Sequence, residues 1–185
     1  MKIGTFLKIA DWLNEEKITW ALGASSVLFY NGYEVVPNDF DLFVELDQYQ
    51  KVESKLKMIG NLIYKEDANS IYNTQGFNSF EIEDIEVDLI AGFYIRHNEG
   101  EYKFPFDWHS IDQVFNYEGS QINVMSLEDW YALHQLIPGR EEKVKIIYNF
   151  LMNKEFIRIG LLRRSLELDL PKEVKDSISK ITEYQ

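Results

Sequence analysis

Three acidic side chains in two apolar segments have a spacing that suits a metal-binding site. Asp39 and Asp41 stand two residues apart at the start of the apolar segment 40–45, and Asp88 lies within the apolar segment 85–90. Residues two apart in a strand point to the same side, so Asp39 and Asp41 would project together and an adjacent strand would add Asp88. Carboxylates gathered in this way repel one another unless a cation lies among them. We expect Mg²⁺, or Mn²⁺ in its place, because these ions prefer oxygen ligands and bring phosphates with them.

The third acid has a rival in the same segment. Glu86 has the same parity as Asp88, and further acids crowd positions 81–84. We interpret most of these other acids as the solvated tip of a hairpin. Asp88 is favoured as the third acid because apolar residues flank it on both sides. Burial of a carboxyl group among them is costly unless the group has a partner such as a metal ion.

The order of these motifs resembles the nucleotidyltransferase superfamily, whose members have the polymerase-beta-like fold. Its signature is a strand, a Gly-Gly or Gly-Ser turn, a helix, an Asp-x-Asp strand and a later third acid. Here the signature reads as Trp20-Ala21-Leu22, Gly23-Ala24-Ser25-Ser26, Asp39-Phe40-Asp41 and Asp88. The resemblance covers roughly residues 1–92.

The resemblance implies a Mg²⁺-dependent transferase that moves a nucleoside monophosphate from an NTP to an acceptor hydroxyl, with pyrophosphate leaving. Asp39 and Asp41 would hold the metal ion, and Asp88 would complete the site as a ligand or as the general base. The turn Gly23-Ala24-Ser25-Ser26 would bring backbone N–H groups to the terminal phosphates, at the start of a short helix.

A second region, Met125 to Leu151, resembles the helical part of minimal, toxin-like and antibiotic-modifying nucleotidyltransferases. Ser126-Leu127-Glu128-Asp129 and Gly139-Arg140 fit the pattern of that region. A lysine that contacts the phosphates in toxin-like relatives is replaced here by His134 or Gln135. A later acidic position of the pattern holds Lys143 or Lys145.

Arg140 and Lys143 are therefore candidate phosphate contacts in place of the missing lysine. The alternative is that they are exposed at the start of a helix and paired with Glu141 and Glu142. His134 lies on an apolar helix face, and we favour a hydrogen-bonded, half-buried histidine over a catalytic one.

Composition narrows the class of protein. The chain has 185 residues, 45% of them hydrophobic, and no cysteine, which excludes disulfides and fits a reducing compartment. No signal peptide or membrane-spanning stretch is visible, so we expect a cytoplasmic protein. The formal net charge of −12 argues against a broad nucleic-acid interface and is compatible with a cationic small molecule as acceptor. The oligomeric state is left open.

Periodicity and turn residues predict an α+β protein: a nucleotidyltransferase-like mixed β-sheet with helices on one face, followed by a C-terminal helical region. We divide it into a catalytic domain, residues 1–125, and a helical region packed against it, residues 126–185. The predicted strands are 18–22, 40–45, 62–64, 77–82, 85–90, 113–117 and 121–125. The predicted helices are 3–15, 25–30, 47–59, 127–137, 140–152, 154–167 and a last one opened by Pro171.

Two other functions stay open beside the transferase, for which a small-molecule acceptor is weakly favoured. The missing lysine motivates a nucleotide-binding or partner-binding module with little or no catalysis. The resemblance to toxin-like branches leaves room for the toxin component of a toxin–antitoxin pair.

Overall fold

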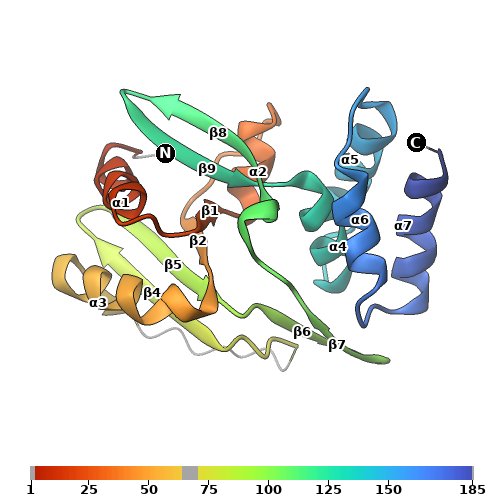
Figure 1. Ribbon diagram of the computed structural model, residues 1–185, viewed down its shortest axis with the longest axis horizontal. Coiled ribbons are helices and arrows are strands. Elements are labelled where there is room, and N and C mark those ends of the chain that lie inside the picture. The colour runs from red at the N-terminus through yellow and green to blue at the C-terminus, as the bar shows by residue number, and fades with distance from the viewer. Residues whose placement is uncertain (1–2, 64–70, 185) are drawn as a thin grey trace.

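The computed structural model describes residues 3–63 and 71–184 (Figure 1). Its helices are α1 (Ile3–Glu15), α2 (Ala24–Tyr30), α3 (Tyr49–Ile59), α4 (Leu127–Leu136), α5 (Glu141–Asn153), α6 (Ile159–Leu166) and α7 (Lys172–Tyr184). Its strands are β1 (Trp20–Leu22), β2 (Phe40–Val44), β3 (Asn61–Ile63), β4 (Gly76–Ile82), β5 (Ile85–Ala91), β6 (Tyr94–His97), β7 (Gly100–Lys103), β8 (Ile111–Tyr117) and β9 (Ser120–Met125).

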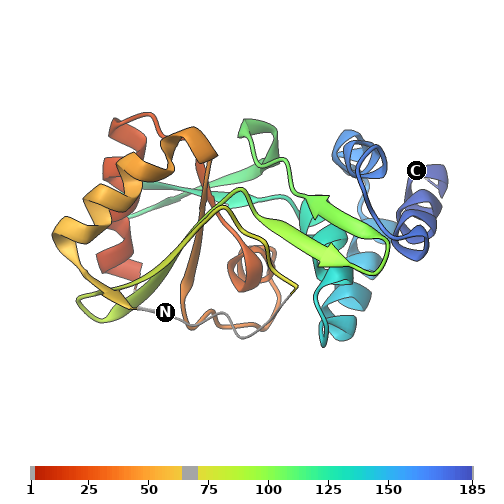
Figure 2. The same cartoon turned by 90° about the horizontal axis from the view of Figure 1, so that it is seen from below.

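Seven of the strands form one mixed sheet in the order β3-β4-β5-β2-β1-β9-β8. The pairs β2–β5 and β1–β9 are parallel, and the other neighbours are antiparallel. Strands β6 and β7 form a separate hairpin. The four C-terminal helices gather at one end of the molecule, away from α1 and α3, in both views (Figures 1 and 2). The predicted α+β class, with a mixed sheet and a C-terminal helical region, is confirmed.

Alternation along β2 places Phe40 on one face of the sheet, and Asp41 and the buried Phe43 on the other. Phe40 is buried and stacks on Phe6 of α1, with ring centroids 4.3 Å apart. Its register partner on β5, Val87, faces the same side, as does Phe80 of β4 opposite Val87. Helices α1 and α3 cover this face, so the residues between the buried ones, Asp41 among them, point to the opposite face.

Several predicted boundaries are wrong for identifiable reasons. The strand expected at 18–22 begins at Trp20, because the N–H of Ile18 donates to Leu13 O and that of Thr19 to the side chain of Gln48. The helix expected from 154 begins at Ile159, because the N–H of Arg158 donates to the carboxylate of Glu128.

The helix expected at 47–59 also differs. Asp47 lies in a 3-10 turn, and Gln48 takes the N-cap position of α3. Gly60 is the C-cap in an extended conformation, and Ile59 at the end of the helix is 41% exposed. The hairpin of β6 and β7 was not predicted, and Tyr64 of the predicted strand 62–64 lies outside the described residues.

The division at residue 125 stays a prediction. Strand β9 ends at Met125, and Ser126 caps α4 by accepting a hydrogen bond from the N–H of Asp129. The sheet and the helical region are therefore joined without a loop between them.

A buried ion pair links α4 to α6. Asp129 is fully buried, and Arg164 Nη2 lies 3.1 Å from its Oδ1. Arg164 also donates to Asp107 Oδ1 and Ser110 Oγ, which precede β8. Burial raises the pKa of the Asp129 carboxyl group to about 6, although Arg164 acts in the opposite direction. The guanidinium group therefore offsets part of the free-energy cost of burying the Asp129 carboxylate.

We expect Arg164→Met to lower the free energy of unfolding by about 3–5 kcal/mol at pH 8, because it leaves a buried carboxylate without its cation. The loss should be smaller at pH 5. A carboxyl group whose pKa is raised by folding binds its proton more tightly in the folded state, so its unfavourable contribution falls as the pH drops through that pKa. Urea unfolding at the two pH values measures both effects.

The matched control is Arg163→Met, at an exposed position of the same helix. It should change stability by less than about 0.5 kcal/mol. An equal loss for the two variants, or a loss for Arg164→Met that does not depend on pH, would show that the ion pair does not have this role.

Candidate active site

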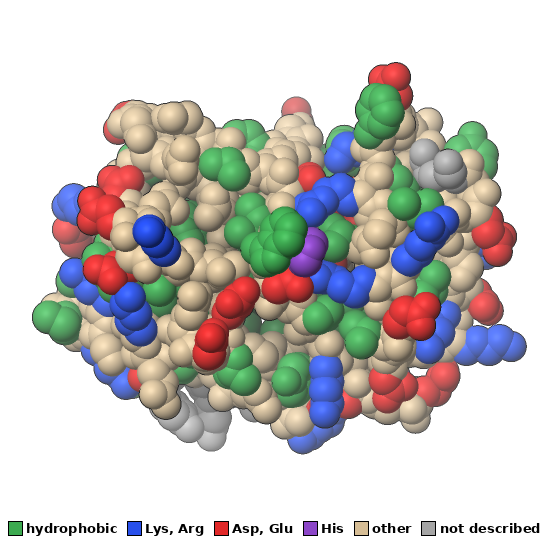
Figure 3. Space-filling view, in the orientation of Figure 1, with side chains coloured by type: hydrophobic (Ala, Val, Ile, Leu, Met, Phe, Trp, Pro, Cys, Tyr) green, Lys and Arg blue, Asp and Glu red, His purple; other side chains and the backbone are tan. Residues whose placement is uncertain are grey.

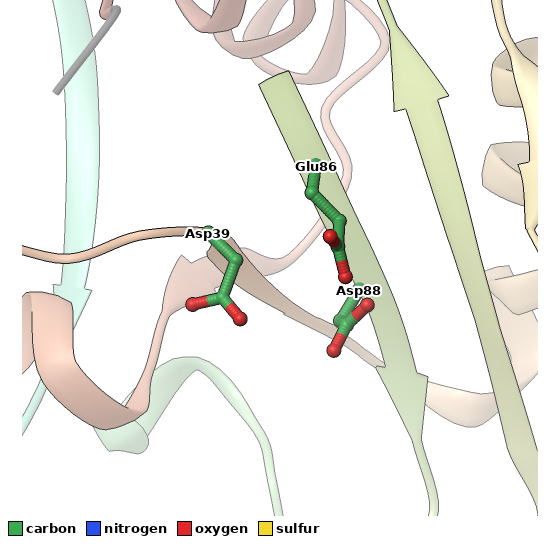
Figure 4. Close-up of side chains that lie close together, drawn as sticks. All are labelled: Asp39, Glu86 and Asp88. Atoms are coloured by element: carbon green, nitrogen blue, oxygen red, sulfur yellow. The ribbon is translucent and has the colours of Figure 1, made fainter. Parts of the chain in front are cut away.

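The parallel pairing of β2 with β5 brings carboxyl side chains together on the face of the sheet opposite α1 and α3. Asp41 and Asp88 are register partners. One carboxylate oxygen from each of Asp39, Glu86 and Asp88 lies within 4.8 Å of the others. Figure 4 shows Glu86 and Asp88 projecting from one strand towards Asp39, which directly precedes β2. The strands thus present two rows of acids, two residues apart on each strand.

The predicted and observed groups of acids overlap in part. The structure brings Asp39 and Asp88 together as predicted. Asp41 lies beside Asp88 but outside the group of three, so its role as a metal ligand stays a prediction. Glu86, considered as a rival of Asp88, is partly buried and joins Asp88 in the group instead of replacing it. The spacing of two residues between Glu86 and Asp88 indicates that both side chains point to the same face of the strand.

Asp88 is held in a fixed orientation. Its side chain is 7% exposed, and its Oδ1 accepts a 2.6 Å hydrogen bond from the hydroxyl of Ser79, its register partner on β4. Three carboxylates with mutually close oxygen atoms form a hard donor set, and their repulsion falls when a divalent cation lies among them. The residues present therefore fit Mg²⁺ or Mn²⁺.

Two of the acids on these strands, Asp41 and Asp88, line a cavity of about 520 Å³. Asp41 and Asp88 contribute from the sheet, and Arg140 and Lys143 contribute from the start of α5. The remaining lining is largely aromatic or apolar, with some polar side chains: Ala24, Phe43, Tyr72, Asn73, Thr74, Phe77, Ile90, Phe93, Trp130, His134 and Ile137. Acidic and basic groups thus face one another across a space of small-molecule size.

Lys143 is close enough to the acids to respond to their charge. Burial and the neighbouring Arg140 lower the pKa of the Lys143 ammonium group, while Asp41 and Asp39 act in the opposite direction. Lys143 is partly buried at the cavity, whereas Lys145 of the same helix is exposed. Of the two lysines that the sequence offered, the structure places Lys143 at the acids.

Solved structures resemble this arrangement of sheet and helices. A Thermotoga maritima protein assigned as a nucleotidyltransferase matches with a TM-score of 0.60 and 23% identity, over 80% of this chain and 91% of its own. ANT(2'')-Ia, solved in complex with adenylyl-2''-tobramycin, matches with a TM-score of 0.51 and 13% identity, over 96% and 93% of the two chains. The chain has the nucleotidyltransferase fold. No family model matches the sequence, and the search of curated proteins finds no match.

In the nucleotidyltransferase fold of this chain, the turn after β1 leaves no room for a side chain on Gly23. A Cβ atom on Gly23 would lie 2.5 Å from the ring of Phe43 and 2.7 Å from that of Trp130. Ala24 lines the cavity with φ at +43°, and Ser26 is fully buried. Of the predicted contacts Gly23, Ala24, Ser25 and Ser26, Ala24 is the one whose side chain borders the cavity. Phosphate contacts by the others remain a prediction.

His134 is more deeply buried than the sequence suggested. Its side chain is 3% exposed, and among the described residues neither ring nitrogen has a hydrogen-bond partner. The expectation of a hydrogen-bonded, half-buried histidine is therefore wrong. Burial, and then the charges of Lys143 and Arg140, lower the pKa of the imidazole to about 3, so the ring is neutral at physiological pH. Nothing in the spacing of the sequence distinguished this position from a core histidine.

We expect Asp39→Asn, Glu86→Gln and Asp88→Asn each to weaken Mn²⁺ binding by at least about tenfold, because each removes a charged oxygen from the donor set. Electron paramagnetic resonance of free Mn²⁺ measures the affinity. The matched control is Glu81→Gln, at the exposed register partner of Glu86 on β4, which should change the affinity by less than about twofold. Wild-type affinity in Glu86→Gln would place the metal ion elsewhere.

Proposed function

We propose that the protein is a Mg²⁺-dependent nucleotidyltransferase that moves a nucleoside monophosphate from an NTP to an acceptor hydroxyl. The observation that carries the proposal is the group of oxygen donors formed by Asp39, Glu86 and Asp88, beside Asp41 and across a cavity from Lys143. The fold supports it, since the matched solved structures include an antibiotic adenylyltransferase complex.

The acids divide between holding a metal ion and accepting a proton. Asp39 and Asp41 would bind Mg²⁺, with Asp88 and Glu86 completing the donor set. When bound, the ion would neutralise phosphate charge and orient the leaving group. The acceptor oxygen forms a bond to the α-phosphorus while the bond to the pyrophosphate oxygen breaks. The hydroxyl proton passes to Asp88, whose Oδ1 is already oriented by Ser79, or to Glu86 beside it.

The basic side of the cavity would hold the phosphates. Lys143 and Arg140 lie at the start of α5 and line the cavity opposite the acids. A triphosphate placed between them would meet positive charge on one side and the metal ion on the other. Backbone N–H groups of the turn from Gly23 to Ser26 would contact the terminal phosphates beside Ala24.

A small molecule is the acceptor that best suits this site. The cavity volume of about 520 Å³ is in the range of small-molecule sites, and its aromatic lining suits a flat or apolar surface. On the face shown in Figure 3, acidic and basic side chains of the described residues are interspersed, without an extended basic stretch. With a net charge of −12, a broad nucleic-acid interface is disfavoured and a cationic acceptor is compatible. No helix in residues 3–63 and 71–184 is long and apolar enough to cross a membrane.

A second candidate function is a nucleotide-binding module with little or no catalysis. His134, one of the two residues that could stand in place of a phosphate-contacting lysine, is neutral, and this favours the module. The toxin component of a toxin–antitoxin pair is a further candidate, and the same experiment addresses it. Incubation with each labelled NTP, Mg²⁺ or Mn²⁺ and a cell extract separates these functions. Label on a small molecule, an RNA or a protein identifies the acceptor class, whereas binding without any labelling supports the module.

We expect Asp39→Asn, Asp41→Asn and Asp88→Asn each to reduce the labelling rate by about 10²–10³-fold, since each weakens the stabilisation of charge in the transition state. The fold should persist, because an amide at position 88 can still accept the hydrogen bond from Ser79. Near-ultraviolet circular dichroism checks the fold. A folded Asp41→Asn protein with wild-type activity would remove Asp41 from the site.

We expect Lys143→Gln and Arg140→Gln to act mainly on NTP binding, because a phosphate contact operates in both the ground state and the transition state. Each should weaken NTP affinity by about tenfold, while Lys145→Gln, at the exposed position two residues along the same helix, should leave it unchanged. Calorimetry with a non-hydrolysable NTP measures these affinities. Equal affinities for the Lys143 and Lys145 variants would assign Lys143 to the surface.

A further inference from the structure

Two buried polar side chains on successive turns of α4 border the same cavity without hydrogen-bond partners. Trp130 and His134 are each 3% exposed, and their ring centroids are 4.9 Å apart. Both line the cavity that holds Asp41 and Asp88. Among the described residues, Trp130 Nε1 and both ring nitrogens of His134 lack a partner. A buried polar group left in this way costs about 1–3 kcal/mol, which a bound molecule would recover.

The hydrogen-bonding capacity of the two rings defines what that molecule must offer. An indole N–H can only donate, and a neutral imidazole has one donor and one acceptor. A ligand that meets Trp130 must therefore present an acceptor atom at this side of the cavity. Deprotonated phosphate oxygens are acceptors only, so both nitrogens of His134 can donate to a deprotonated phosphate chain only after the ring has gained a proton.

The charged groups around His134 come from several elements. Helix α5 supplies Lys143 and Arg140, which disfavour the protonated imidazole. Glu141 of α5 and Glu173 of α7 line a second cavity, of about 450 Å³, that shares His134. Across the first cavity lie Asp41 and Asp88.

Two further helices, α6 and α2, contact α4. Arg164 of α6 is paired with Asp129, one turn or more towards the N-terminus of α4. Helix α2 contains no acidic or basic side chain other than Tyr30. Burial is the main reason that the ring stays neutral, and the charges of Lys143 and Arg140 add to it. An anion bound between these two side chains and His134 would offset their charge.

We propose that Trp130 and His134 bind the phosphate chain of the nucleotide, and that His134 takes up one proton from solvent when the chain binds. The inference rests on the proposed function. The positive charge of His134 would be present only in the nucleotide complex. Nucleotide binding therefore tightens as the pH falls from 8 to 6, and the proton returns to solvent when pyrophosphate leaves.

The test is proton-linked calorimetry. The probe is the α,β-methylene analogue of the tightest-binding NTP, with Mn²⁺, titrated at pH 6, 7 and 8 in two buffers that differ in heat of ionisation. The terminal phosphate of the probe titrates in the same range, with a pKa of about 6, so wild type is compared with His134→Gln, in which that contribution is unchanged. Wild type should take up more protons at pH 6, by up to one per site, and the difference should vanish at pH 8.

Two further variants control the interpretation. His134→Lys has a fixed positive charge at this position. Its affinity for the NTP analogue should therefore change with pH no more than the affinity of His134→Gln does. His109→Gln, which replaces an exposed histidine that stacks on Trp108 away from the cavity lining, should keep the wild-type linkage. Equal proton uptake by wild type and His134→Gln, with both binding the probe, would overturn the inference and leave the proposed function standing. Absence of binding of every NTP to folded wild type would overturn both.

Trp130→Phe tests the second ring, because it keeps the aromatic packing and removes the N–H group. It should weaken the binding of inorganic triphosphate and of the NTP analogue by the same factor, about five- to tenfold. Thermal unfolding verifies that the variant is folded. Weakened binding of the NTP analogue with unchanged binding of inorganic triphosphate would show that Trp130 contacts the base or the sugar instead.

Discussion

The parallel pairing of β2 with β5 holds acidic side chains on one face of the sheet against their mutual repulsion. Asp41 opposite Asp88 is a direct consequence of that register, and the neighbouring row adds Asp39 and Glu86. The opposite face supplies the apolar contacts that hold the two strands together, beginning with Phe40 on α1. Apolar packing therefore fixes the positions of the acids, although the acids themselves do not stabilise the fold. Such an arrangement is typical of ligand-binding sites.

The C-terminal helices complete this site by adding charge of the opposite sign. They are fixed to the end of the sheet by the buried pair of Asp129 and Arg164 and by the capping of α4 at Ser126. This attachment places the start of α5 across the cavity from the acids, so that Lys143 responds to the charges of Asp39 and Asp41. An anion with a bound divalent cation fits between the two sides better than either ion alone.

The sequence carried most of the information about the sheet, because alternation of apolar and acidic residues fixes which face each side chain takes. It predicted the strands with Asp39, Asp41 and Asp88, but it did not distinguish Glu86 from the hairpin tip, although the two-residue spacing was visible. The sequence did not predict that His134 is neutral and, among the described residues, unpaired, since that state depends on burial in the tertiary structure and then on the charges of Lys143 and Arg140. The β6–β7 hairpin was missed because its short strands contain charged residues and little apolar alternation.

The most direct test of the account is a crystal structure with Mn²⁺ and a non-hydrolysable NTP, in which anomalous scattering locates the metal ion. The account predicts an anomalous peak within ligand distance of the carboxylates of Asp39, Glu86 or Asp88, with the phosphate chain between the ion and Lys143. A nucleotide bound outside this cavity, or phosphates in the cavity with Mn²⁺ on other residues, would contradict the central claim.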